Sequence, residues 1–226
     1  MILKLKVTLI NKDEDLSTVN PERILNPTGH PGISNWRDLK FNWDSDLYRY
    51  TGKISKRIFL RTLLRNPSYR YTFLMRLCTY FAKNPCNPLK KVMFRVTYEV
   101  FRCYSLRSSV EITHNTLIGG GLYIPHLIGI VIHEDTVIGK NCNISQNVTI
   151  GHLKRGERKG SPTIGDNVYI APGAVILGKI KIGNNVIIGA NSVVTKDIPE
   201  NAVAAGVPAQ IISLDGSVDY IDRTDY

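Results

Sequence analysis

Apolar residues recur at every sixth position between residues 112 and 194. The first run is Ile112, Ile118, Ile124 and Ile130, and a slip of two residues leads to Ile132, Ile138, Ile144 and Ile150. After an insertion of eight residues the run continues with Ile164, Ile170, Ile176, Ile182, Ile188 and Val194. A strand repeats every two residues and a helix every 3.6, so neither alone explains a strict period of six over about 80 residues. The pattern predicts a β-solenoid in which each short strand forms one side of a coil.

Glycine or asparagine follows most of these apolar positions closely. Examples are Gly119, Gly139, Gly151, Gly165, Gly183 and Gly189, with Asn141, Asn143, Asn167, Asn184 and Asn185 nearby. These residue types tolerate the positive φ of a tight corner best. Three six-residue sides with their corners then make a triangular coil of about 18 residues. The alternative is an ordinary β-sandwich with chance spacing, which the length of the repeat disfavours.

Several phrases carry a family resemblance: GGGLYIPHLIGIVI (119–132), NVTIG (147–151), SPTIGDNVYIAPGAVILG (161–178), IIGANSVVTKDIP (187–199) and AAGVPAQII (204–212). This stretch resembles the hexapeptide-repeat acyltransferases, above all serine acetyltransferases and the O-acetyltransferases of surface polysaccharides. The resemblance covers residues 105–212 strongly and the first hundred residues weakly. It implies a left-handed parallel β-helix, acetyl-CoA as co-substrate, and a homotrimer with the cofactor between neighbouring subunits.

The chain is expected to have three parts. These are an N-terminal region over residues 1–104, helical from about residue 44; the left-handed β-helix catalytic domain over 105–200, with a loop at 152–161; and a C-terminal segment with an acidic tail over 201–226. Within the helical region, breaks are expected at Asn66-Pro67 and between Asn84 and Pro88. The fold class is therefore mainly β, preceded by a small α-helical domain. Residues 1–40 receive no function.

The bulk composition indicates a cytoplasmic protein. The N-terminus turns charged at once, which does not fit a secretory leader, and no run of 18 apolar residues occurs. The four cysteines, Cys78, Cys86, Cys103 and Cys142, have no CxxC spacing and read as free thiols. We therefore expect neither a disulfide framework nor a metal site.

The positive charge is concentrated before the solenoid. Residues 1–100 hold 18 Lys and Arg against 8 Asp and Glu, whereas the remaining residues are balanced. Between Lys53 and Arg107 the basic and apolar residues are mixed in helical fashion. A solvated basic face explains this, and so does attraction to an anionic inner membrane surface or an acidic glycan. Nucleic acid is not expected as a partner, because no recognised reading motif accompanies the charge.

His126 is the candidate general base. An imidazole suits the removal of a hydroxyl proton near neutral pH, and the context PHLIG matches the motif that holds the active-site histidine in the resembling family. Glu111, 15 residues earlier, stands where serine acetyltransferases have an aspartate that orients the histidine. The alternatives are a histidine merely exposed on a coil and a carboxylate with no partner. The register further predicts that His126 stacks in one column with Gln146, Pro172 and Ala190, about 4.8 Å apart per coil.

Three positions depart from serine acetyltransferase. Pro125 replaces an aspartate, Ser161 a histidine and Gly160 an arginine, so charged groups that bind serine in the family are missing. The acidic tail also replaces the terminal isoleucine by which that family grips its partner enzyme. The sequence therefore favours transfer of acetyl from acetyl-CoA to a sugar hydroxyl of a surface polysaccharide or its precursor. Serine O-acetyltransferase, in cysteine biosynthesis, is the alternative.

Motif position in the resembling family supplies the remaining candidates. The cofactor-binding set is Ala171, Pro172, Ala190, Thr195, Lys196, Gly206, Val207 and Pro208. In the loop, His152, Lys154, Arg155, Arg158 and Lys159 could meet a cofactor phosphate or an acidic glycan. A solvated loop without a role explains them equally well, and each cofactor candidate alone could be an ordinary corner residue.

Two further functions use the same fold. The γ-type carbonic anhydrases bind zinc through three histidines across a subunit interface, and His126 with His133 could mimic two of them. That family's paired histidine spacing is missing, so zinc is disfavoured. A catalytically silent scaffold is the last alternative.

Overall fold

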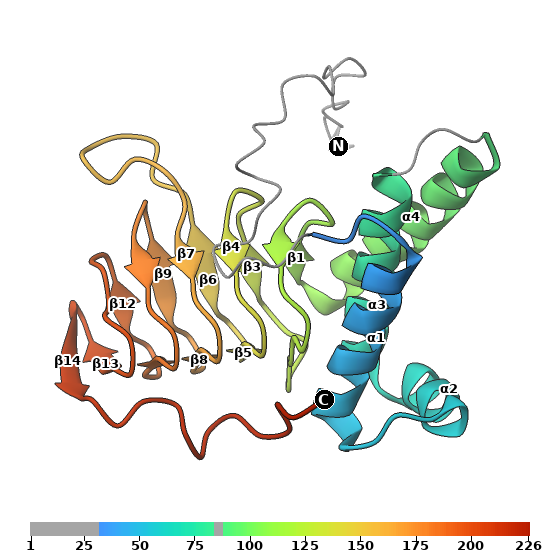
Figure 1. Ribbon diagram of the computed structural model, residues 1–226. Helices are drawn as coiled ribbons and strands as arrows, with labels where there is room; N and C mark the ends of the chain where they lie inside the picture. The colour runs from blue at the N-terminus through green and yellow to red at the C-terminus, as the bar shows by residue number, and fades with distance from the viewer. Residues whose placement is uncertain (1–31, 84–87) are drawn as a thin grey trace, which may run out of the picture.

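A computed structural model describes residues 32–83 and 88–226. Most of the N-terminal region to which no function is assigned (residues 1–31) lies outside the described residues. The predicted break at 84–87 lies outside them as well. Within the described part, four helices stand at one end of a solenoid of short strands (Figure 1). The helices are α1 (Trp36–Thr51), α2 (Lys56–Arg65), α3 (Pro67–Ala82) and α4 (Pro88–Ser108). Helix therefore starts earlier than the predicted residue 44 and ends beyond the predicted boundary at 104.

Local sequence explains where these helices begin. The Asn35 side chain accepts hydrogen bonds from the backbone N–H groups of Arg37 and Asp38, and the Asp38 carboxylate accepts one from the Asn35 N–H, which completes a capping box. Asn66 caps α3 by accepting from the Tyr69 N–H, with Pro67 at the first helical position. The predicted break at Asn66-Pro67 is thus present.

The solenoid consists of two- and three-residue strands that pair in parallel, followed by a terminal antiparallel pair. The strands are β1 (Glu111–Ile112), β2 (Leu117–Ile118), β3 (Val131–Ile132), β4 (Val137–Ile138), β5 (Asn143–Ile144), β6 (Thr149–Gly151), β7 (Thr163–Ile164), β8 (Tyr169–Ile170), β9 (Val175–Leu177), β10 (Lys181–Ile182), β11 (Ile187–Ile188), β12 (Val193–Val194), β13 (Val203–Gly206) and β14 (Ala209–Ser213). They form three sheets in the orders β1-β3-β6-β9-β12, β10-β7-β4-β2 and β14-β13-β11-β8-β5. Each sheet is one side of a triangular prism.

The observed register confirms the period of six. Ile112 pairs with Ile132, Ile132 with Ile150, and Ile150 with Ile176, so the two-residue slip and the eight-residue insertion leave the core column continuous. These side chains are almost completely buried. β-Branched side chains fit this narrow interior because each packs on its equivalent in the neighbouring coils. The extra residues are accommodated at corners of the prism.

The prism has three corners, A, B and C, each formed by the turns that follow one sheet. Corner A follows the sheet that contains β5 and β8, and comprises residues 125–130, 145–148, 171–174 and 189–192. Corner B follows the sheet of β3 and β6, and comprises 133–136, 152–162, 178–180 and 195–197. Corner C follows the sheet of β4 and β7, and comprises 119–122, 139–142, 165–168, 183–186 and 199–202.

Corner C carries a ladder of asparagines with positive φ. The Asn141 amide donates to Asn167, Asn167 to Asn185, and Asn185 to Asn201, at 3.0–3.1 Å. Each side chain tolerates the left-handed backbone and hydrogen-bonds its equivalent one coil away. The frequent asparagines of the sequence therefore stabilise the stacking of coils as well as the turns.

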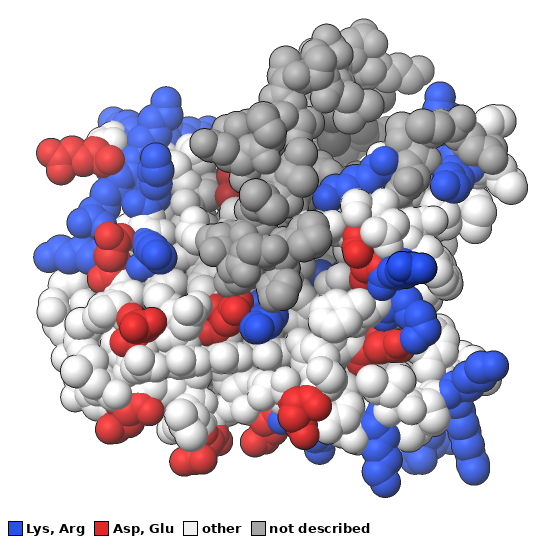
Figure 2. All heavy atoms as spheres, viewed as in Figure 1, with Lys and Arg blue, Asp and Glu red and all other residues white. Residues whose placement is uncertain are grey.

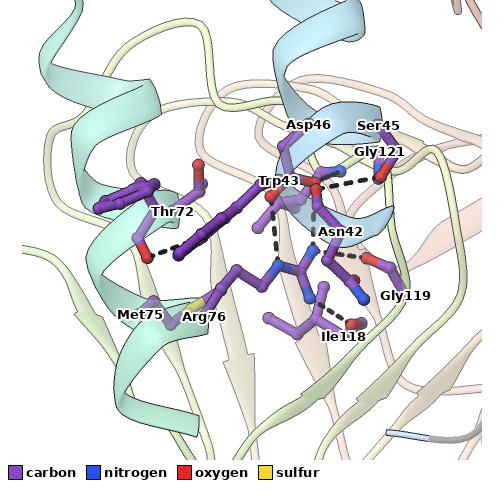
Figure 3. Close-up of polar contacts among 12 residues, drawn as sticks. Asn42, Trp43, Ser45, Asp46, Thr72, Met75, Arg76, Ile118, Gly119 and Gly121 are labelled. Carbon is purple, nitrogen blue, oxygen red and sulfur yellow. Dashed lines mark hydrogen bonds and ion pairs between the residues drawn. The ribbon is translucent and has the colours of Figure 1, made fainter. Parts of the chain in front are cut away.

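A buried ion pair joins the helices to the first coil (Figure 3). The Arg76 guanidinium of α3 donates to both carboxylate oxygens of Asp46 in α1 at 3.2 Å, and to the carbonyl oxygens of Ile118 and Gly119. Asp46 also accepts from the backbone N–H of Leu122 at 2.8 Å. Burial raises the pKa of the Asp46 carboxyl, and Arg76 acts against that shift. The contacts position α1 and α3 on corner C of the first coil.

The C-terminal segment returns along the solenoid towards α1 (Figure 1). β13 continues the sheet of β11, so the solenoid extends to Gly206, past the predicted boundary at 200. Further on, the Tyr226 hydroxyl donates to the Asn141 side chain at 2.6 Å. No helix in residues 32–83 and 88–226 is long and apolar enough to cross a bilayer.

Candidate active site

His126 lies on corner A of the first coil, at the point where the two-residue slip occurs. The backbone N–H of Asn147 donates to the carbonyl of Ile128, whereas Gly173 donates to Gln146 and Asn191 to Pro172. Ile128 therefore occupies the corner position equivalent to Gln146 and Pro172. The predicted column beginning with His126 is wrong in its first member, because the extra residues lengthen this corner. The His126 side chain is exposed there.

A cleft of about 1030 Å³ opens in front of this corner. The solenoid contributes Pro125, His126, Leu127 and Ile128, and the helical region contributes side chains from all four helices. Tyr50 holds the two parts together: its hydroxyl donates to the Ile124 carbonyl at 3.2 Å and accepts from the Ile124 N–H at 3.0 Å. Burial raises the pKa of the Tyr50 phenol, so this group stays neutral. His126 therefore sits in a concave site rather than on an isolated coil face.

Four arginines line the cleft: Arg61, Arg65, Arg70 and Arg107. Arg70 is structural, because it donates to the carbonyls of Leu63 and Leu64 and to the Tyr104 hydroxyl. The other three are exposed, and among the described residues no carboxylate forms an ion pair with any of them. Their guanidinium groups are available to an anionic ligand. These arginines were not among the predicted site residues, although Arg57, Arg61 and Arg65 have the i, i+4 spacing of one helix face.

Glu111 begins β1, where its backbone N–H donates to the Ile130 carbonyl at 2.7 Å. Its exposed side chain forms no hydrogen bond or ion pair with His126, and it is not among the residues that line the cleft. The orienting role predicted for Glu111 therefore stays a prediction.

The cofactor candidates divide between different parts of the solenoid. Ala171, Pro172 and Ala190 share corner A, one coil apart. Gly206 to Pro208 form the tight turn between β13 and β14, close to that corner, since the Gly206 N–H donates to the Ser192 hydroxyl. Thr195 and Lys196 lie on corner B instead. The structure thus brings most of this set to one edge of the prism.

The loop at 152–161 projects from corner B and is strongly basic. Lys154, Arg155, Arg158 and Lys159 are exposed, and Arg158 faces Asp197 at 3.7 Å. Figure 2 shows basic side chains gathered where Figure 1 draws this loop, and others at the lower right beside α2. At the loop base, Leu153 and Gly160 pair through both backbone hydrogen bonds. In the described chain the loop does not reach the cleft around His126.

His152 at the start of this loop contacts Ser161 at its end, with 3.1 Å between Nδ1 and Oγ. His133 and Asp135 lie beside them, whereas His126 belongs to a different corner. A carbonic anhydrase-like site would need His126 beside His133. Among the described residues, His133 instead lies beside His152 and Asp135, and His126 is not part of this group.

Comparison with known proteins identifies the family. Residues 161–196 match the family model for the bacterial transferase hexapeptide, six repeats. A serine acetyltransferase of Staphylococcus aureus strain Mu50 is 42% identical over 130 residues, which is 58% of this chain and 60% of that protein. A soybean serine acetyltransferase complexed with serine superposes with a TM-score of 0.61 at 30% identity, over 78% of this chain and 70% of the other. The chain belongs to the hexapeptide-repeat acetyltransferases that include the serine acetyltransferases.

A serine acetyltransferase in complex with CoA is similar as well, with a TM-score of 0.61 and 28% identity over 78% of this chain and 71% of that one. These matches confirm the fold class as a left-handed parallel β-helix preceded by a helical domain. The chain spans about 60% of the length of the curated relatives it matches.

The comparisons overturn the predicted acceptor. The relatives and solved structures named above are serine acetyltransferases, so the polysaccharide prediction is wrong and the stated alternative is favoured. The prediction rested on charges lost at Pro125, Gly160 and Ser161 and on the acidic C-terminal tail. It did not place the basic residues of the helical domain near His126, whereas Arg61 and Arg107 bring positive charge to the cleft. A carboxylate therefore has possible partners that the motif comparison did not count.

Proposed function

We propose that this protein transfers an acetyl group from acetyl-CoA to the hydroxyl of L-serine. The observation that carries the proposal is the location of His126 in a cleft whose exposed arginines have no carboxylate partner among the described residues. The similarity to serine acetyltransferases, including complexes with serine and with CoA, supports both substrates.

The chemistry requires a base, which His126 supplies. Its imidazole removes the serine hydroxyl proton as the oxygen attacks the thioester carbonyl. The C–S bond then breaks, and the proton passes from the imidazolium to the departing CoA sulfur. The products are O-acetylserine and CoA, so charge and protons balance.

Charge pairing favours an amino acid as the acceptor. A serine carboxylate can form a bidentate pair with a guanidinium of Arg61, Arg65 or Arg107, which a neutral alcohol cannot do. Small residues at Ala171 and Ala190 allow the pantetheine arm of the cofactor to approach the coil along corner A. Lys196 lies on corner B, so it can pair with a cofactor phosphate when corner B of a neighbouring copy lies beside corner A. The attraction of residues 53–107 to an anionic membrane surface stays a prediction.

Release of free CoA thiol in the presence of acetyl-CoA tests the proposal. We expect turnover with L-serine, a mass of O-acetylserine in the product, and much slower turnover with the methyl ester of serine, which lacks the carboxylate charge. Equal turnover of acid and ester would remove the role of the arginines. No turnover with L-serine, alongside turnover of an uncharged alcohol, would overturn the proposed substrate.

A further inference from the structure

Corner B brings together four polar side chains from two neighbouring coils. His133 and Asp135 follow β3, and His152 and Ser161 come from the two ends of the basic loop that follows β6. The Ser161 Oγ lies 3.2 Å from Nδ1 of His133 and 3.1 Å from Nδ1 of His152. Asp135 Oδ2 lies 3.7 Å and 4.0 Å from the same two nitrogens. Residues distant in sequence thus converge on one point.

The orientation of the rings excludes a relay of the Ser-His-Asp type. Such a relay places the hydroxyl and the carboxylate on opposite nitrogens of one imidazole. Here both Ser161 and Asp135 face Nδ1 of each histidine. The backbone N–H of Asp135 also donates to Nδ1 of His133 at 3.2 Å, which requires a lone pair on that nitrogen. Both Nδ1 atoms and the Asp135 carboxylate therefore face a common space beside the Ser161 hydroxyl, and a metal bound to Nδ1 of His133 would replace the hydrogen bond from the Asp135 N–H.

The spacing suits a small divalent cation. A tetrahedral zinc ion with bonds of about 2.0–2.1 Å holds neighbouring ligand atoms about 3.3 Å apart. The four distances above range from 3.1 to 4.0 Å, and the ligand atoms of His133, Asp135 and His152 all lie within 4.8 Å of one another. The three side chains are only partly buried, so small rotations can bring their atoms together. Two imidazoles and a carboxylate are a ligand set for zinc and its neighbours among the transition metals.

We propose that His133, Asp135 and His152 bind one zinc ion, with the Ser161 hydroxyl or water at the fourth position. The ion joins corner B to both ends of the loop at 152–161, above the Leu153–Gly160 backbone pair. It thereby holds the base of the loop that presents Lys154, Arg155, Arg158 and Lys159. The observations behind this proposal concern corner B alone, so it does not rest on the role assigned to His126 on corner A. It also reverses the expectation of no metal site, which considered cysteine spacing and the His126–His133 pair but not the loop.

Metal titration of the full chain tests the site. The protein is freed of metal by chelator dialysis and titrated with zinc in competition with a chromophoric chelator. We expect one equivalent to bind per chain, with affinity at least about ten- to a hundredfold weaker in His152→Asn and in Asp135→Asn, since losing a direct ligand costs no less than losing an outer-shell partner. His126→Asn is the matched control and keeps wild-type zinc affinity. Equal affinity in all variants, or no binding by the wild type, would overturn the site.

Cobalt substitution and proteolysis give separate readouts. Cobalt(II) bound to nitrogen and oxygen ligands shows visible d–d bands without the thiolate charge-transfer band that the exposed Cys103 would cause. Trypsin should cleave the loop more slowly when zinc is present in the wild type, and zinc should give no protection in His152→Asn. A thiolate band, or zinc protection that persists in His152→Asn, would count against this site.

Discussion

The backbone N–H of Asn147 donates to the carbonyl of Ile128 at 3.0 Å, and this bond decides where His126 lies. Because Ile128 occupies the corner position of its coil, His126 belongs to the two-residue extension and extends into the cleft lined by the helices. The two-residue slip in the six-residue pattern therefore places His126 outside the regular corner position, where it lines the cleft.

Replacing His126 with alanine should lower kcat for acetyl transfer by about two to four orders of magnitude, the usual effect of a positioned general base. The affinity for acetyl-CoA should change little, because the imidazole acts on the acceptor hydroxyl. Steady-state kinetics and isothermal titration with CoA measure the two quantities. Wild-type turnover in His126→Ala would show that another group is the base.

Replacing Glu111 with glutamine should lower kcat less than the loss of His126 does, by about tenfold or less. The carboxylate forms no hydrogen bond with the imidazole in the described structure, so it can contribute only through a longer-range orientation of the ring. The comparison uses kcat of both variants under the same conditions. A loss as large as that of His126→Ala would mean that the two side chains come together in the bound state.

Arg61 and Arg107 are the candidates to bind the serine carboxylate. Replacing the one that binds it with alanine should raise the KM for L-serine by about ten- to a hundredfold, because a hydrogen-bonded charge pair contributes about 1.5–3 kcal/mol. Arg102→Ala is the matched control, because Arg102 is exposed on the same helix α4 and pairs with Glu99. Its KM should stay at the wild-type value. An unchanged KM in Arg61→Ala, Arg65→Ala and Arg107→Ala would remove the arginine cleft from acceptor binding.

Replacing Asp46 with asparagine should destabilise the fold by about 3–5 kcal/mol, because the buried Arg76 charge would lose its partner. Asp44→Asn is the control in the same helix, where an exposed pair with Lys40 contributes less than about 1 kcal/mol. Urea denaturation followed by circular dichroism gives both values. Equal stabilities of the two variants would show that the Asp46–Arg76 pair does not anchor the helices.

The protein should sediment with three times the mass of one chain. Thr195 and Lys196 lie on corner B, whereas His126 and Pro172 lie on corner A, so a single chain does not unite all the candidates. Threefold symmetry places different faces of neighbouring chains in contact and can complete the site. Equilibrium sedimentation measures the mass, and the mass of a single chain would contradict the prediction.

The β-helix could be predicted from the sequence because its contacts are periodic. Ile132 packs against Ile150 in the next coil, so the interior leaves a direct record in the spacing of the chain. The break at Asn66-Pro67 could be predicted for a similar reason, since capping and the missing proline N–H act within a few residues.

The tertiary structure decided the surroundings of His126 and of His133. Arg107 and Arg61 reach the cleft through the packing of helices on the first coil, which depends on aperiodic contacts such as Asp46–Arg76. His152 and Ser161 meet because the backbone closes the loop between them. The sequence alone therefore determined the coil and its candidate base, while contacts between parts without a common period determined which charges and ligands surround them.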